Sequence, residues 1–209
     1  MTFSSREQAG RELGKRLLEL GVKPDVVLGL PRGGVQVAAE AARILQCPLD
    51  VLVVRKIGHP RQREFAVGAL AEPDVVLLDR DASEKARVED ADLQAVIAEE
   101  TERLQNYQTK FHPTGAMLLE GRTVLIIDDG LATGATTEAA VLSARQQKAQ
   151  RVIVASPVAS SHAAARLRAV ADEVITLVTD PEFGAVGQYY GFFPQTTDEE
   201  VLALLQHHA

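Results

Sequence analysis

The chain has 209 residues, of which 46% are hydrophobic and 24% are charged, and its formal net charge is −7 at pH 7. These proportions are typical of a folded domain, so a largely disordered chain is not expected. The negative net charge argues against duplex nucleic acid as a partner, because binding of that kind needs a basic face.

The single cysteine, Cys47, excludes an internal disulfide and favours a reducing compartment. No apolar run approaches the length of about 18 residues that a membrane-spanning helix needs, and the N-terminus lacks the pattern of a signal peptide. We therefore expect a soluble cytoplasmic protein with no membrane partner. The length predicts a single domain over residues 1–209.

Short apolar runs alternate with amphipathic stretches along the chain. Strands are predicted at residues 25–30, 50–54, 75–78, 124–127, 151–155 and 174–178. Helices are predicted at residues 35–45, 83–107, 138–147 and 161–171. Two further helices are predicted at the ends of the chain, one capped by Ser4 or Ser5 and one capped by Thr196 or Thr197. This alternation predicts an α/β fold with a doubly wound, mainly parallel sheet, helices on both faces, and ligands at the carboxyl ends of the strands.

The loop after the first predicted strand has the sequence Pro31-Arg32-Gly33-Gly34. A guanidinium group between a proline and two glycines can reach an anion such as pyrophosphate with little crowding. Taken alone, an ordinary strand-to-helix turn with a surface arginine explains the same residues equally well.

Positive charge is concentrated after the second predicted strand, at Arg55, Lys56, His59, Arg61 and Arg63. Glycine and proline lie in the same stretch, which predicts a flexible loop that closes over a bound ligand. Lys56, beside the strand end, is the candidate for a fixed phosphate contact. His59, Arg61 and Arg63 are the candidates for mobile contacts. A solvated charged loop is the alternative interpretation.

Residues 123–137, TVLIIDDGLATGATT, carry the strongest functional pattern. An unbroken apolar run predicts a buried strand, and Asp128 and Asp129 follow where that strand ends. The next turn offers glycines, hydroxyl groups and backbone N–H groups at the start of a helix, which together suit a phosphate. Its residues are Gly130, Leu131, Ala132, Thr133, Gly134, Ala135, Thr136 and Thr137. The lysine of a Walker loop and the G-x-G-x-x-G of a dinucleotide site are both absent from this stretch.

An acid pair followed by G-x-x-T-G-x-T resembles the phosphoribosyl-pyrophosphate (PRPP) signature of the type I phosphoribosyltransferases. The resemblance covers about residues 22–180. It implies that Asp128 and Asp129 hold the ribose 2- and 3-hydroxyls and that the following loop holds the 5-phosphate. The 31–34 loop resembles the pyrophosphate loop of the family, in which a cis non-proline peptide bond is common. The basic stretch resembles the flexible loop that closes over PRPP.

The resemblance also implies a reaction, in which a small nitrogen-containing acceptor such as a nucleobase attacks C1 of PRPP and pyrophosphate leaves. Asp128 and Asp129 would fix the ribose, and Arg32 and Lys56 would offset the charge of the leaving group. Mg²⁺ is the implied cofactor, held mainly by the substrate rather than by a metal site of the protein. The motifs VRKIG and GQYYGFFPQTTDEE resemble a bacterial branch whose acceptor is open, so neither the acceptor nor a general base is assigned.

Five aromatic residues gather in the tail, at Phe183, Tyr189, Tyr190, Phe192 and Phe193. Family members carry a small hood that binds the nucleophile, and here the hood is expected to draw on the first helix and the tail. The aromatic rings either stack on a base or fill the gap between hood and sheet. The acidic helix at 83–107 is predicted to have a solvated polar face, and a contact through it would give a homo-oligomer.

Two other classes of function remain open from the sequence. A regulator that senses PRPP or a nucleotide would keep the phosphate loop and the acid pair without turnover. A Mg²⁺-dependent phosphatase would use the aspartates directly, but it leaves the glycine- and threonine-rich loop unexplained.

Overall fold

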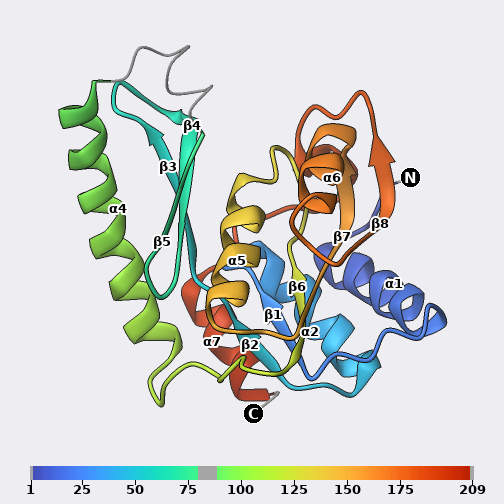
Figure 1. The fold of residues 1–209 in the computed structure, drawn as a ribbon. Coiled ribbons are helices and arrows are strands. Elements are labelled where there is room, and N and C mark those ends of the chain that lie inside the picture. The colour runs from blue at the N-terminus through green and yellow to red at the C-terminus, as the bar shows by residue number, and fades with distance from the viewer. Residues whose placement is uncertain (1, 80–88, 208–209) are drawn as a thin grey trace.

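The structure is a computed structural model that describes residues 2–79 and 89–207. A five-stranded parallel sheet lies at its centre, in the order β2-β1-β6-β7-β8 (Figure 1). The strands are β1 (Val26–Gly29), β2 (Leu49–Val51), β6 (Thr123–Ile127), β7 (Arg151–Ser160) and β8 (Glu173–Asp180). The predicted doubly wound parallel sheet is therefore confirmed. Its order reverses between β1 and β6, so the loops after these two strands lie at the place where such sheets bind ligands.

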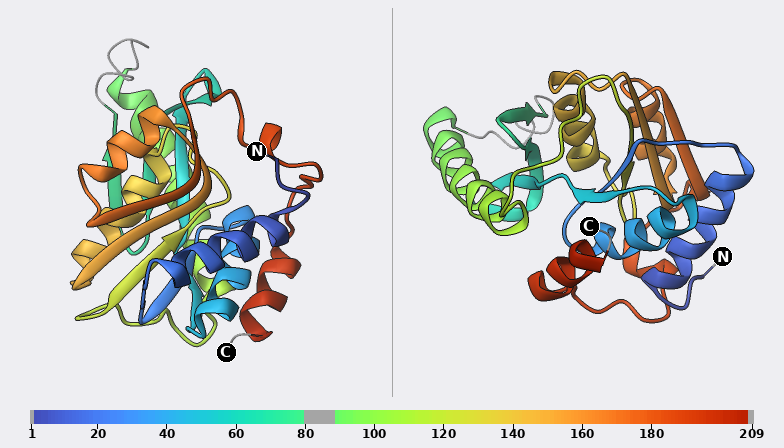
Figure 2. Two further views of the ribbon diagram at one scale, coloured as in Figure 1. Left: turned by 90° about the vertical axis from the view of Figure 1, so that its right-hand side faces the viewer. Right: turned by 90° about the horizontal axis from the view of Figure 1, so that it is seen from below.

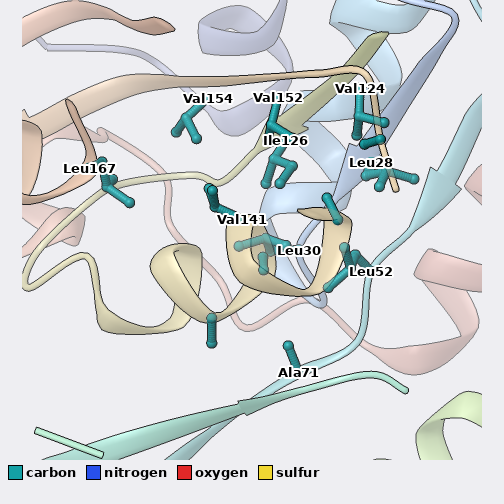
Figure 3. Close-up of a cluster of buried hydrophobic side chains, with 14 of the residues drawn as sticks. Leu28, Leu30, Leu52, Ala71, Val124, Ile126, Val141, Val152, Val154 and Leu167 are labelled. Carbon is teal, nitrogen blue, oxygen red and sulfur yellow. The ribbon is translucent and has the colours of Figure 1, made fainter. Parts of the chain in front are cut away.

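Helices cover both faces of this sheet. α1 (Arg6–Glu19) and α2 (Gly33–Leu45) pack on one face, and α5 (Ala135–Gln146) and α6 (Ser161–Arg168) pack on the other. Alternate residues of β6 serve the two faces, as expected for a strand buried on both sides. Val124 and Ile126 join the cluster under α5 and α6, which Figure 3 shows. The intervening β6 residues join the cluster under α1 and α2.

A second, antiparallel sheet stands beside the first. It has the order β3-β4-β5, with β3 (Val54–His59), β4 (Gln62–Ala71) and β5 (Val75–Leu78). α4 (Asp90–Phe111) packs along this sheet, and Figure 2 shows helix and hairpin together to one side of the central sheet. The predicted start of this helix, residues 83–88, lies outside the described residues.

The predicted loop at residues 55–64 is wrong, because this stretch forms the β3–β4 hairpin with a turn at Pro60 and Arg61. Ile57 and Val67 are fully buried in the cluster that α4 covers, and this apolar packing holds the two strands in place. The density of charge around Ile57 hides the first of these two residues in the sequence. The strand predicted at 75–78 exists, but it pairs with β4 and does not join the parallel sheet.

The N-terminal segment and the first part of the tail meet at the carboxyl edge of the central sheet. Ser5 caps α1, since its Oγ accepts a hydrogen bond from the Gln8 N–H, and Phe3 forms a β-bridge with Tyr190. A short 3-10 helix, η1 (Val186–Tyr189), and the last helix, α7 (Asp198–His207), complete the tail. Thr197 and Glu200 form the predicted capping box of α7, with side-chain to backbone distances of 3.2 and 2.7 Å. None of the described helices is both long and apolar enough to cross a membrane.

Candidate active site

The loops after β1 and β6 meet at one edge of the sheet. The backbone N–H of Leu30 donates to the carbonyl of Ile127 at 2.9 Å, which holds the ends of the two strands together. The peptide bond between Pro31 and Arg32 is cis, as the resemblance implies. A Cβ atom on Gly33 would overlap the carboxylate of Asp129, so only glycine allows this close approach. Two motifs almost a hundred residues apart in the sequence therefore form one site.

The loop after the acid pair leads directly into α5. Gly134 has φ +76°, a left-handed conformation that favours glycine, and α5 begins at the next residue. Leu131 is buried and bridges to Ala159 of β7, which fixes the start of the loop. Thr136 lines a cavity beside this loop, which is described below. Thr137 is buried, and its hydroxyl points into the protein. The start of α5 thus directs backbone N–H groups toward a position that suits an anion.

The acid pair is held by contacts that were not predicted. Nε of Arg6 donates to Oδ2 of Asp129 at 2.7 Å, and the Asp129 N–H donates to Oδ1 of Asp128 at 2.8 Å. The Tyr190 hydroxyl donates to the Asp129 carbonyl at 2.6 Å. Burial raises the pKa of both carboxyl groups; the neighbouring Asp129 raises that of Asp128 further, while Arg6 opposes the rise at Asp129.

A cavity of about 490 Å³ opens in front of Asp128. The basic hairpin forms one of its walls, through Arg55, Lys56 and Arg63. His59 and Arg61 lie at the tip of the hairpin and are not among the residues that line this cavity. The structure therefore brings three of the five predicted basic residues to the cavity that Asp128 lines.

α4 lies against the hairpin and extends this wall through Glu99, Glu100 and Arg103. Glu100 pairs with Arg55 and with Arg103, both at 2.7 Å, and Glu99 pairs with Arg63 at 2.7 Å. The prediction that the polar face of this helix is simply solvated is thus wrong. Part of that face pairs with arginines that the hairpin presents to it.

Arg32 turns away from this cavity toward the C-terminal helix. Its Nη1 lies 3.5 Å from Oδ1 of Asp198, in the first turn of α7, and Lys110 of α4 lies 2.6 Å from the other oxygen of the same carboxylate. Arg32 lines an adjacent cavity of about 270 Å³ together with Arg55 and Tyr107. Its neighbour Pro31 lines both cavities.

The tail aromatic residues differ in exposure: Tyr190 fills space inside the protein, whereas Phe192 is 67% exposed. Tyr190 is buried, with its ring 5.7 Å from that of Phe3 and 4.9 Å from that of Phe193. This packing places the N-terminal segment and the tail together beside Asp129. The Phe193 ring is partly exposed, and it also covers the guanidinium group of Arg6 at 3.7 Å.

The sequence contains one signal by which Arg6 could have been found. It lies on the same helical face as Ala9, Leu13 and Leu17, which are fully buried. A charged residue on the apolar face of a helix needs a partner. The partner itself carries no local signal, since Asp129 lies 123 residues further along the chain.

The possible metal ligands among residues 2–79 and 89–207 are scattered. These ranges hold no group of three or more histidine, cysteine, aspartate or glutamate residues that could bind a metal ion. Asp128 offers a carboxylate at the cavity surface, which is the donor type that Mg²⁺ prefers.

Comparison with known proteins agrees with this geometry. Two Mycobacterium tuberculosis proteins, each described as a "putative phosphoribosyl transferase", are 46% identical to this chain over 204 residues. The match takes in 97% of this chain but 46% of each relative, so the chain spans about half the length of the curated relatives it matches.

Solved structures extend the comparison to the fold. TT1426 from Thermus thermophilus is 43% identical, with a TM-score of 0.81 and 100% of both chains covered. AQ2163 from Aquifex aeolicus resembles the chain in fold alone, at 13% identity and a TM-score of 0.52, over 84% of this chain and 74% of that one. The sequence profile of the phosphoribosyl transferase domain matches residues 4–190, which include every element that lines the cavity in front of Asp128. The chain therefore belongs to the phosphoribosyl transferase domain family.

Proposed function

We propose that this domain transfers the 5-phosphoribosyl group of PRPP to a small nitrogen-containing acceptor, releases pyrophosphate and requires Mg²⁺. The observation that carries the proposal is that two anion-binding loops, 31–34 and 130–137, meet around the acid pair beside a cavity with basic walls. A domain of this family with these groups at one sheet edge is suited to a ligand that carries phosphate at both ends of a ribose. The single cysteine supports a reducing, cytoplasmic location.

Binding and orientation are the first contribution of the protein. The backbone N–H groups after Gly134 bind the 5-phosphate at the positive end of α5. Asp128 and Asp129 accept hydrogen bonds from the two ribose hydroxyls. Holding both ends of the ribose phosphate fixes C1 with respect to an incoming acceptor, which removes much of the entropic cost of the encounter.

Electrostatic stabilisation is the second contribution. As the bond from C1 to pyrophosphate breaks, positive charge develops on the ribose and negative charge on the leaving group. The acid pair stabilises the ribose, while Lys56 and Arg32 stabilise the pyrophosphate. Asp128 would be the protein ligand for a substrate-bound Mg²⁺, which would supply further positive charge to offset that of the leaving group.

Calorimetric titration with PRPP, with and without Mg²⁺, tests the donor site. We expect saturable binding that depends on Mg²⁺, and pyrophosphate release once a suitable base is added. The double substitution Asp128→Asn plus Asp129→Asn should raise the Kd for PRPP about 100-fold or more, because each hydrogen bond to a charged group contributes about 1.5–3 kcal/mol. Asp92→Asn, on the exposed face of α4, is the matched control and should leave the Kd unchanged.

The outcomes separate the proposal from its alternatives. Absence of PRPP binding in both conditions would contradict it. Unchanged affinity in the double variant would remove the ribose-binding role of the acid pair. Tight binding of PRPP without pyrophosphate release, whatever base is offered, would instead favour a PRPP-sensing regulator.

A further inference from the structure

Arg6 joins four segments that are far apart in the sequence. It is 6% exposed and donates from Nε to Asp129 at 2.7 Å and from Nη1 to the carbonyl of Pro194 at 2.7 Å. Its guanidinium group lies 3.7 Å from the centre of the Phe193 ring. A Cβ atom on Gly33, in the loop after β1, would lie 2.8 Å from Nε of Arg6. The N-terminal helix, the acid pair, the 31–34 loop and the tail therefore meet at one side chain.

The position of Arg6 is unfavourable for a cation considered alone. It occupies the first turn of α1, where the helix dipole repels positive charge, and burial removes most of its hydration. The ion pair with Asp129 and the ring of Phe193 offset these costs. A residue that only covered the hydrophobic core at this position would not need the charge.

Arg6 cannot act as a direct ligand for a phosphate in this arrangement. Phe193 and the Pro194 carbonyl cover it, and it is not among the residues that line the cavity in front of Asp128. Asp128 lines that cavity. Asp129 is not among its lining residues, and its Oδ2 accepts a hydrogen bond from Arg6. Any effect of Arg6 on a ligand must therefore pass through Asp129.

We propose that Arg6 is a positioning residue, which anchors the Asp129 carboxylate through Oδ2 and so presents the acid pair to the ribose hydroxyls of the ligand. This inference rests on the proposed function, because it requires that the ligand carry a ribose. Gly33 of the 31–34 loop packs against the ion pair, but the hydrogen bonds of Arg6 among the described residues go to Asp129 and Pro194 and to neither the 31–34 nor the 130–137 backbone. Arg6 thus acts selectively on the sugar part of the ligand.

Comparison of two ligands isolates this role. Arg6→Gln is titrated with Mg²⁺-PRPP, which contains ribose, and with Mg²⁺-pyrophosphate, which does not. We expect the Kd for PRPP to rise about tenfold or more, since truncating one partner of a buried ion pair has effects of this size. The Kd for pyrophosphate should stay within about twofold. The PRPP affinity of the variant should also need a higher pH, because Arg6 opposes the rise in the pKa of Asp129.

Arg11→Gln is the matched control. It removes the same charge from the same helix, but Arg11 is partly exposed and its ion pair with Glu40 has a distance of 3.8 Å. Both Kd values should be those of the unmodified protein. Thermal unfolding of each variant reports whether the fold persists. Should Arg6→Gln not fold, Arg6→Lys serves in its place, because lysine keeps the charge but cannot bind Asp129 and the Pro194 carbonyl at once. We expect this variant to lose less affinity for PRPP than Arg6→Gln would, and to keep its affinity for pyrophosphate.

Two results would overturn the inference while leaving the proposed function intact. One is unchanged affinity of a folded Arg6→Gln variant for PRPP. The other is an equal loss for PRPP and pyrophosphate, which would mean that Arg6 holds the whole site together rather than the acid pair. If the unmodified protein binds pyrophosphate but not PRPP, the proposed function fails, and the inference that rests on it falls as well.

Discussion

His112 illustrates how a single residue can hold distant elements together. It follows the last turn of α4, and its side chain is 6% exposed, with the ring nitrogens 3.1 Å from the carboxylate of Glu72 and 3.5 Å from that of Asp50. Burial alone lowers the pKa of His112, but the hydrogen bonds and charges of these two carboxylates outweigh it and raise the pKa to about 9 from 6.5. At neutral pH the imidazole is therefore a cation that links α4, β2 and the end of β4.

This linkage predicts a pH dependence of stability. The folded protein holds the His112 proton up to a pH of about 9, whereas the unfolded chain releases it near 6.5. The stabilisation is thus fully present below pH 6.5 and is lost as the pH rises through 9, by up to about 3 kcal/mol. Urea unfolding at pH 6, 7.5 and 9 should show this fall, and His112→Gln should flatten it. His162→Gln, on the surface of α6, should leave the slope unchanged; equal slopes in all three proteins would refute the linkage.

At the scale of elements, α4 and the β3–β4 hairpin behave as one unit. Leu93, Val96 and Leu104 of the helix bury their side chains together with Ile57 and Val67 of the strands. Beside this apolar contact, acidic residues of the helix pair with arginines of the hairpin. The ion pairs fix the wall of the cavity, and the apolar contact holds the wall in place.

Glu100 is the residue on which this wall depends most, because its side chain is only 7% exposed and it binds both Arg55 and Arg103. Glu100→Gln should lower the free energy of unfolding by about 1–2 kcal/mol, a value kept small because both arginines are partly exposed and screened by solvent. Urea unfolding measures the change. Glu102→Gln, an exposed position on the same helix, should differ from the unmodified protein by no more than about 0.5 kcal/mol. Equal effects of the two substitutions would mean that the ion pairs contribute no stability.

Across the whole molecule, the parts that sequence predicts are those with local patterns. The unbroken apolar run of β6, the acids after it and the glycines of both loops are short-range signals, and the parallel order of the strands then brings the loops together. The hairpin was missed because the charged residues, glycine and proline around Ile57 favour a loop in the sequence. The ion pairs of Arg6 and Asp198 could not be predicted, because each joins segments whose distance depends on the complete fold.

Asp198 is a second place where the tail reaches the site, besides Tyr190, and it leads to a prediction for the molecule as a whole. Its carboxylate binds Arg32 of the 31–34 loop and Lys110 of α4, so the C-terminal helix competes with an anionic ligand for Arg32. Asp198→Asn should release that arginine and lower the Kd for Mg²⁺-pyrophosphate about two- to fivefold, with the gain reduced at high salt. Glu199→Gln removes a charge from the same turn, and no hydrogen bond joins it to either cation among the described residues. A similar gain in both variants would point to the general negative field of α7, and no gain in Asp198→Asn would mean that the tail does not restrain Arg32.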